Sequence, residues 1–308
     1  MSFLSTATDR FANAATHRVA ANNQRLVLLV AWLEKIRTAV RAHDAEASMT
    51  AFTFELLQLK TGQPGAFQQY GFQTRLQRPQ HVPEAMVFSR REDEVLLFNL
   101  EYHGAAIATI LNAMDRFLVP GTSPEFYNSA TIALVHLAFQ KKDRCRALYE
   151  QGGTTAVARM MQMYRTIDYI QVIGIAALMV LGTHILDGDI KVSSAKKMSL
   201  ESLILSQIVE AMEYHQGSSR IYTVACSALG TLFGPRSQIL VSGGHPENYL
   251  YHRVLYALTF GLILHLDDSM AQGVGNALLS NMVGHDVAED MIAEVERNHG
   301  GVTCAAAA

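Results

Sequence analysis

"NSATIALVHLAFQKKDRCRALYEQGGTTAVARMMQMYR" spans residues 128–165 and is the stretch that decides the fold. It contains two helical patterns of apolar residues, and Gly152-Gly153 separates them. A glycine pair at this point ends one helix and lets the chain turn sharply into the next. Alanines stand where a core would accept leucine, so a neighbouring helix can approach closely. The stretch therefore predicts one layer of a stack of helices.

A short motif, A-L-x-x-L, recurs in the predicted helices that follow loops. Its members are Ala133-Leu134 with Leu137, Ala177-Leu178 with Leu181, and Ala228-Leu229 with Leu232, and Ala257-Leu258 echoes it more weakly. The final leucines of the three full members are 44 and 51 residues apart. Stacked repeats of two or three helices have periods of about 40–47 residues, with small residues at close contacts and leucines between layers. The spacing thus favours stacked helical repeats over an irregular bundle.

Helical patterns cover most of the chain, and no segment alternates at period two for long. Residues 17–60 predict two helices, the second with Ser48 as its N-cap. Glycines, prolines and a charged run then predict an irregular connection over 61–93, and helices dominate from Val95 onward. We expect an all-α protein with a helical N-terminal extension at 1–93, helical repeats at 94–300 and a flexible tail at 301–308.

Composition excludes several classes of protein. Hydrophobic residues make up 49% and charged residues 17% of the 308, and this balance predicts a folded core. The net charge of -3 provides no basic field for nucleic acid. Three cysteines without a CxxC pair predict neither disulfides nor zinc, which indicates an intracellular, cytoplasmic protein. Arg10, Arg18 and Arg25 leave mitochondrial targeting open.

The longest uncharged run, residues 169–186, approaches the length of a membrane span. It contains Gln171, Thr183 and His184, and acids rather than basic anchors flank it. A helix buried on all sides in a layered helical protein has the same composition. We therefore expect a buried helix and no membrane span.

The stretch at 128–165 resembles the armadillo repeat, with an alanine-rich second helix, a glycine turn and an apolar third helix. The later layers match less well, because the third lacks a clear glycine turn and the intervals are long. The resemblance, over about residues 95–300, implies an armadillo-like right-handed α-solenoid whose third helices line a groove. Arg159, Gln162 and Arg165 would face that groove, either as contacts to a peptide or as solvated helix surface. The family's asparagine ladder is absent, so an importin-like function is not implied.

A second group of candidate binding residues lies near the last repeat. Its members are Tyr249, Tyr251, His252, Arg253 and Tyr256. Tyrosine and arginine are enriched at binding hot spots, although they also pack half-buried at the ends of solenoids. The charged segment "EDMIAEVERN", residues 289–298, has the narrow apolar stripe of a helix that caps such an end.

A third pattern suggests chemistry. Asp267-Asp268 on an apolar helix is typical of all-helical, Mg²⁺-dependent terpene or prenyl synthases, and Asn281, His285 and Glu289 have the spacing of their second metal motif. However, Ala271 stands where a third aspartate is required, and the two segments are only 14 residues apart. Helix capping by the acids is the simpler interpretation.

One thiol also invites a chemical interpretation. Lys142, Arg144 and Arg146 surround Cys145 and would lower its pKa, but the sequence places no partner base beside it. We therefore expect an unreactive thiol at the surface or in the core.

These patterns favour one function and leave two alternatives. We expect a non-catalytic scaffold that binds another protein or peptide through a groove or an end surface, with no catalytic residue, cofactor or metal. The alternatives are the isoprenoid-type enzyme and a structural subunit of a larger assembly, because 17% charge leaves little surface to disperse a free solenoid. The oligomeric state stays open.

Overall fold

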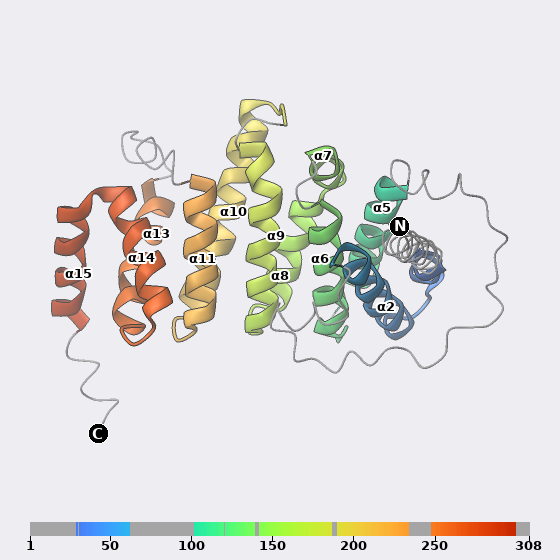
Figure 1. Cartoon of the computed structure of the whole chain (residues 1–308), viewed down its shortest axis with the longest axis horizontal. Helices are drawn as coiled ribbons and strands as arrows, with labels where there is room; N and C mark the ends of the chain where they lie inside the picture. The colour runs from blue at the N-terminus through green and yellow to red at the C-terminus, as the bar shows by residue number, and fades with distance from the viewer. Residues whose placement is uncertain are drawn as a thin grey trace, which may run out of the picture. The chain divides into compact units, whose positions relative to one another are not determined.

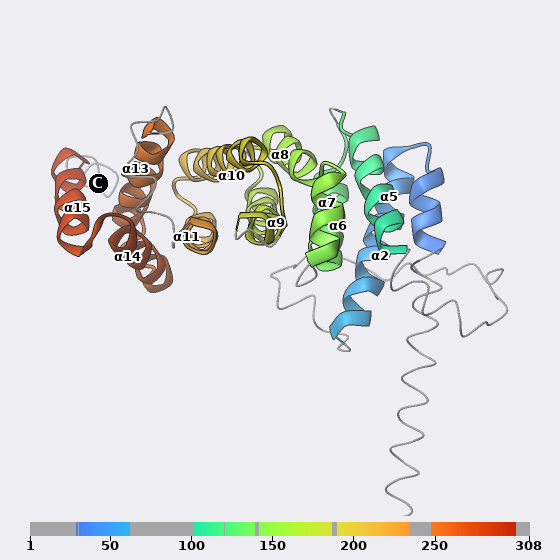
Figure 2. The same cartoon turned by 90° about the horizontal axis from the view of Figure 1, so that it is seen from above.

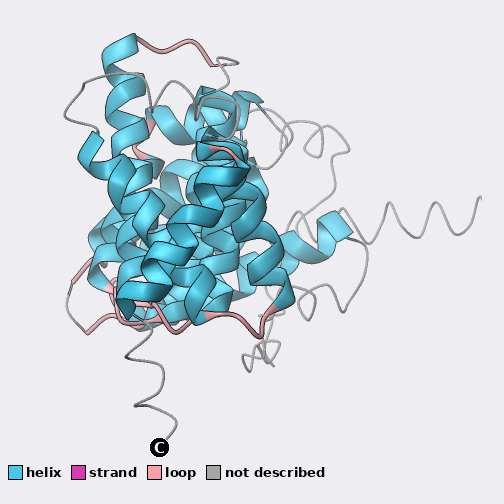
Figure 3. Cartoon of the chain, turned by 90° about the vertical axis from the view of Figure 1, so that its left-hand side faces the viewer, coloured by secondary structure: helices cyan, strands magenta, loops and turns pink. Residues whose placement is uncertain are grey.

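The computed structural model describes residues 29, 31–61, 102–119, 121–138, 142–186, 190–233 and 248–299. Every secondary-structure element within these ranges is an α-helix, which confirms the all-α prediction (Figure 3). The chain divides into two compact units, residues 1–137 and 138–308. The predicted tail, and the predicted connection after Thr61 up to residue 93, lie outside the described residues.

The first unit is built around aromatic side chains. Its helices are α2 (Ala42–Thr61), α5 (Tyr102–Arg116) and α6 (Pro124–Ala138), and residues 31–38 are also helical (Figure 1). The Phe126 ring meets Phe117 and Tyr127 edge to face, with centroids 5.7 and 5.0 Å apart. The Tyr127 hydroxyl donates to the Met114 carbonyl at 3.1 Å, so the largest buried ring also has a polar partner.

Helix α2 begins earlier than the sequence suggested. It starts at Ala42, and Ser48 lies inside it rather than at its N-cap. The Ser48 hydroxyl donates to the carbonyl of Asp44 at 3.0 Å, which is how serine satisfies itself within a helix. The N-cap prediction for Ser48 is therefore wrong, while the prediction of a helix here is confirmed.

The second unit contains the remaining described helices. They are α7 (Lys142–Glu150), α8 (Gly153–Met163), α9 (Asp168–Leu186), α10 (Ser194–Tyr214), α11 (Ser219–Phe233), α13 (Asn248–Leu264), α14 (Ser269–Val283) and α15 (His285–His299). Helices α8, α10 and α13 contact one another in succession, and so do α9, α11 and α14 (Figure 2). We call these series the first row and the second row. Each first-row helix also packs on the second-row helix that follows it, and α15 packs on α13 and α14.

The same turn joins the rows three times. It occupies residues 164–167, 215–218 and 265–268, so it recurs after 51 and then 50 residues. In each turn the fourth residue's N–H donates to the first residue's carbonyl, at 3.0, 2.9 and 3.0 Å. The first residue's N–H donates in turn to a carbonyl four residues back in the preceding helix. Backbone geometry, rather than side-chain identity, therefore repeats most faithfully.

This register corrects the interpretation of the A-L-x-x-L motif. The members at 177–181 and 228–232 occupy corresponding places in α9 and α11 and are buried. The corresponding place in α14 holds Leu278, Leu279 and Met282, all buried. Ala257 and Leu258 lie on α13, in the first row, so they are not the next member of the series.

The stretch at 128–165 contains three helices instead of two. Helix α6 ends at Ala138, and the short α7 begins at Lys142. The predicted glycine turn between α7 and α8 is confirmed, because Gly152 has φ of 82°. A Cβ on Gly153 would lie 2.5 Å from Leu148 Cδ1, so close packing requires the second glycine.

Helix α9 is the described helix long and apolar enough to cross a membrane by length and composition. In the structure 56% of its most apolar window is buried, and it packs against α7, α8, α10 and α11. Its buried Gln171 donates to the carbonyls of Met161 and Tyr164, at 3.0 Å each. Those contacts are what we expect of a helix in the core of a layered protein.

Candidate interaction surface

Helix α13 presents one polar, aromatic face. Tyr249, His252, Arg253 and Tyr256 follow the i, i+3, i+4, i+7 spacing of neighbours on a helix surface. Tyr249 is 72% exposed and Tyr256 46%. Tyr251 falls on the opposite face and is buried, and no described residue forms a hydrogen bond with its hydroxyl. Four of the five predicted residues therefore lie at the surface, and the fifth, Tyr251, lies in the core.

Helix α10 holds Arg253 in place. The Arg253 Nε donates to Glu213 Oε1 at 2.9 Å, and Nη2 donates to Oε2. These hydrogen bonds raise the pKa of Arg253, so the guanidinium is charged throughout the accessible pH range. Arg253 also lies over the Tyr249 ring, 5.8 Å from its centroid. A two-pronged, half-buried pair of this kind fixes the direction of the arginine.

The end of α10 also contacts Arg165, the second residue after α8. The Arg165 guanidinium lies 4.5 Å from the centroid of the Tyr214 ring, and Tyr214 is 46% exposed. His215 Nε2 lies 2.8 Å from the Arg165 carbonyl oxygen, which brings the two turns together. The two sequence-predicted groups therefore meet on consecutive residues, Glu213 and Tyr214. We call this set the Tyr–Arg surface, and its residues are Arg165, Glu213, Tyr214, Tyr249, Arg253 and Tyr256.

The other two predicted groove residues lie further back on α8. Arg159 and Gln162 are both exposed there, three residues apart and on the same side of the helix. Their exposure fits solvated surface as well as a binding face. Of the three residues predicted on this helix, the structure joins Arg165 to the α10–α13 group.

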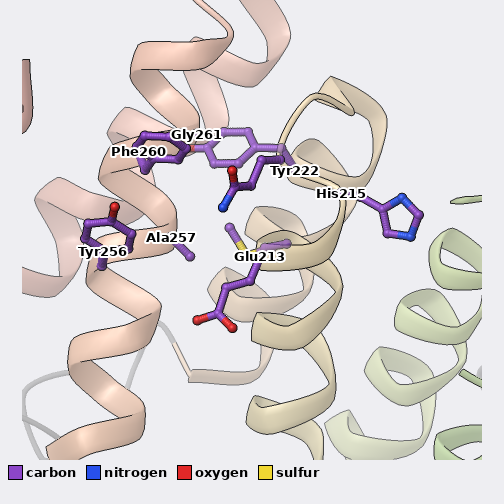
Figure 4. Close-up of a pocket in the computed structure, with 9 residues that line it drawn as sticks. Glu213, His215, Tyr222, Tyr256, Ala257, Phe260 and Gly261 are labelled. Carbon is purple, nitrogen blue, oxygen red and sulfur yellow. The ribbon is translucent and has the colours of Figure 1, made fainter. Parts of the chain in front are cut away.

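A small cleft lies beside the Tyr–Arg surface, between α10 and α13 (Figure 4). It is lined by Met212, Glu213, His215, Gln216, Tyr222, Tyr256, Ala257, Phe260 and Gly261. Figure 4 shows Glu213 and Tyr256 on opposite sides of the cleft and the His215 ring directed away from it. Its volume of about 20 Å³ has room for a water molecule. Pockets for small organic ligands measure about 300–1,000 Å³, so this cleft is too small to enclose such a ligand.

Sequence reasoning missed Glu213, Tyr214 and Phe260. Phe260 stacks on Tyr256 with ring planes 8° apart and centroids 5.8 Å apart. Tyr214 immediately precedes the second turn, as Met163 precedes the first, and only the alignment of the turns places it beside Arg165. The missing signal was the register of the turns, which the A-L-x-x-L motif does not give.

The groups with strongly shifted pKa values lie in the core instead. Burial raises the pKa of Cys145 to about 11 and that of Cys226 to about 12, and it also raises the pKa of the Tyr222 phenol. The expected lowering at Cys145 is therefore wrong, because loss of water outweighs the nearby basic side chains. The Cys145 thiol donates to the Ala138 carbonyl at 3.2 Å, as a core thiol does.

Asp268 is the N-cap of α14. The amides of Ala271 and Met270 donate to its Oδ1, each at 3.0 Å, and together with the Ser219 hydroxyl they lower the pKa of this carboxyl. Asp268 precedes α14, whereas Asn281 lies near its far end, about 20 Å away at the rise of an α-helix. His285 Nε2 instead lies 3.3 Å from Glu289 Oε1 on the surface. Among the described residues no cluster of three or more His, Cys, Asp or Glu could hold a metal ion.

No protein-family model, curated protein or solved structure matches this chain. The surface is therefore interpreted from its own chemistry.

Proposed function

We propose that the chain is a non-catalytic scaffold that binds another protein or a peptide through the Tyr–Arg surface. The observation that carries the proposal is the meeting of two sequence-distant groups, Arg165 and Tyr249–Tyr256, on the end of α10. Arginines held against tyrosine rings, partly exposed and oriented in advance, have the composition of binding hot spots.

The proposed architecture is an armadillo-like right-handed α-solenoid over the second unit. The two rows of helices and the turns recurring after 51 and 50 residues support it. Between successive turns the described residues form two long helices per step, whereas an armadillo repeat has three. The resemblance is then one of stacking principle, and α15 caps the end, with Ala288 buried and the acids of its outer face exposed.

Affinity purification of the tagged chain from its own cells, followed by mass spectrometry and size exclusion, tests the proposal. We expect a stoichiometric partner that is lost when Tyr214→Ala and Tyr256→Ala are combined. Both side chains are 46% exposed, so the variant should stay folded. The matched control is Leu266→Ala with Met270→Ala, which removes side chains that are 64% and 66% exposed elsewhere on the unit.

The same control tests the second candidate, a structural subunit of a larger assembly. Leu264, Leu266 and Met270 are exposed around the turn between α13 and α14, and such a group of apolar side chains is typical of a contact with another chain. A large assembly that dissociates with Leu266→Ala and Met270→Ala, and not with the tyrosine variant, would favour the subunit. A monomer without partners would contradict both candidates.

A further inference from the structure

Histidine occupies the first position of two of the three recurring turns, at His215 and His265. His215 Nε2 lies 2.8 Å from the carbonyl oxygen of Arg165, the second residue of the preceding turn. The His265 ring is likewise hydrogen-bonded to the backbone of Gln216, the second residue of its own preceding turn. A bond from a histidine ring to the backbone of the preceding turn therefore crosses the first joint, between the α8–α9 and α10–α11 pairs, and the second joint, between α10–α11 and α13–α14.

The two bonds differ in their surroundings. His265 is only 8% exposed, and its Nε2 is buried without a hydrogen-bond partner among the described residues. The bond to the Gln216 carbonyl must then be donated by Nδ1, and Nε2 carries the lone pair of a neutral ring. His215 is partly exposed and uses Nε2 for its bond.

Few charges in the described part of the chain face His265. From its own turn comes the Asp268 carboxylate, which already accepts from Ala271, Met270 and Ser219, while Asp267 is exposed to solvent. From α11 comes the Tyr222 phenol, with ring centroids 5.5 Å apart, and its hydroxyl donates to Leu258. From α14 comes the uncharged Gln272, which donates to the carbonyl of His265.

We infer that the second joint is an acid-sensitive contact that opens when His265 gains a proton, whereas the first joint is insensitive. The added proton places an N–H at Nε2, where the closed joint offers no acceptor, so separating the two turns is the way to hydrate it. Gln216 and Tyr222 also line the cleft, so opening the joint widens the space between α10 and α13. This inference does not depend on the proposed function.

The direction of the pH dependence follows from burial. Loss of water lowers the pKa of His265 below its ordinary value of 6.5, and this outweighs the opposing effects of the Gln216 carbonyl and Asp268. The open state then binds more protons than the closed state. The contribution of His265 to the stability of the closed joint is complete above the ordinary pKa of histidine. It is lost as the pH falls below that value, towards the pKa of His265 in the closed state.

Hydrogen exchange of the full chain, read by mass spectrometry at pH 7.5 and 5.5, tests the inference. After correction for intrinsic rates, we expect amides at 265–268 to lose protection in acid and those at 164–167, which lie outside the second joint, to keep theirs. His265→Asn, which keeps a donor near the position of Nδ1 without a titrating ring, should abolish the acid-specific loss, and His215→Asn should leave it intact.

Two results would overturn the inference. One is amide protection at 265–268 that is the same at pH 7.5 and at pH 5.5 in the wild-type chain. This measurement does not depend on any variant being folded. The other is an undiminished acid-specific loss at 265–268 in His265→Asn.

Discussion

The two joints of the second unit use the same turn and are filled differently. At the first joint Gly182 faces the Cδ2 methyl of Leu232, which would lie 2.9 Å from an added Cβ. At the second joint Gly261 and Gly275 face Tyr222: a Cβ added at Gly261 would lie 2.1 Å from the ring, and one added at Gly275 would lie 2.3 Å from the hydroxyl oxygen. A leucine end can rotate away, whereas a buried ring held on two sides cannot.

The difference shows that joints with the same backbone period can differ in how well they tolerate substitution. The first joint depends on apolar ends of flexible side chains. The second depends on a rigid phenol, whose hydroxyl donates to the Leu258 carbonyl at 2.8 Å, and on the buried His265. We therefore expect the second joint to be the more sensitive of the two to substitution and to acid.

The largest expected effect is that of adding one methyl group at each joint. Gly261→Ala forces Tyr222 and its neighbours to shift, at a cost of about 3 kcal/mol, of which the better helix propensity of alanine recovers about 1 kcal/mol. Gly182→Ala costs about 1 kcal/mol in adjustment and recovers about the same. Urea unfolding at pH 7.5 measures both, and equal losses of stability would contradict the proposed difference between the joints.

The glutamine contacts across the turns provide the next comparison. Gln171 is 3% exposed and Gln272 partly exposed, and each donates to two carbonyls across its turn. Gln171→Met leaves both acceptors dry, and we expect a loss of about 2 kcal/mol in the free energy of unfolding. Gln272→Met should cost less, because the Gln272 side chain is partly exposed and loses less by becoming apolar. A larger loss for Gln272→Met would contradict this interpretation.

Two substitutions of Tyr222 distinguish the effect of its ring from the effect of its hydroxyl. Tyr222→Phe keeps the ring and removes the bond to Leu258, so we expect a loss of about 1 kcal/mol that adds to that of Gly261→Ala. Tyr222→Leu, in contrast, vacates the space beside Gly261 and should make the second substitution less costly than it is alone. Double-mutant cycles by urea unfolding distinguish the two, and equal coupling in both cycles would show that the ring is not what limits the joint.

Sequence patterns predicted some of these features and missed others for identifiable reasons. Helical periodicity and the Gly152-Gly153 break gave the helices, because a 3.6-residue period and a left-handed glycine are local properties. The same periodicity would have placed Tyr251 on the buried face of α13, two residues from Tyr249. The close packing of the Tyr222 ring against Gly261 and Gly275 could not be found, because Tyr222 lies 39 and 53 residues earlier in the sequence.

The Tyr–Arg surface lies between these extremes. Tyr249, Arg253 and Tyr256 were identified by residue type, and Arg165 through the resemblance to the armadillo repeat. Tyr214 was missed, because its pairing with Arg165 depends on how two turns stack. Such a contact needs the register of the 164–167 and 215–218 turns, which share backbone bonds but little sequence.

The smallest expected effect on stability accompanies the largest expected effect on binding. Tyr214→Ala and Tyr256→Ala should each change the free energy of unfolding by less than about 0.5 kcal/mol, since both side chains are exposed at the surface. Together they should abolish capture of the partner. A loss of stability comparable to that of Gly261→Ala would mean that these rings serve packing instead.

The most direct test of the proposed function is site-specific photo-cross-linking in the chain's own cells. A benzophenone amino acid replaces Tyr256 on the Tyr–Arg surface or, as the matched control, Ser227, which is exposed on α11 in the second row. We predict a discrete cross-linked partner from position 256 and none from position 227. Cross-links from 227 alone, or from neither position while a partner still co-purifies, would contradict the assignment of the Tyr–Arg surface as the binding site.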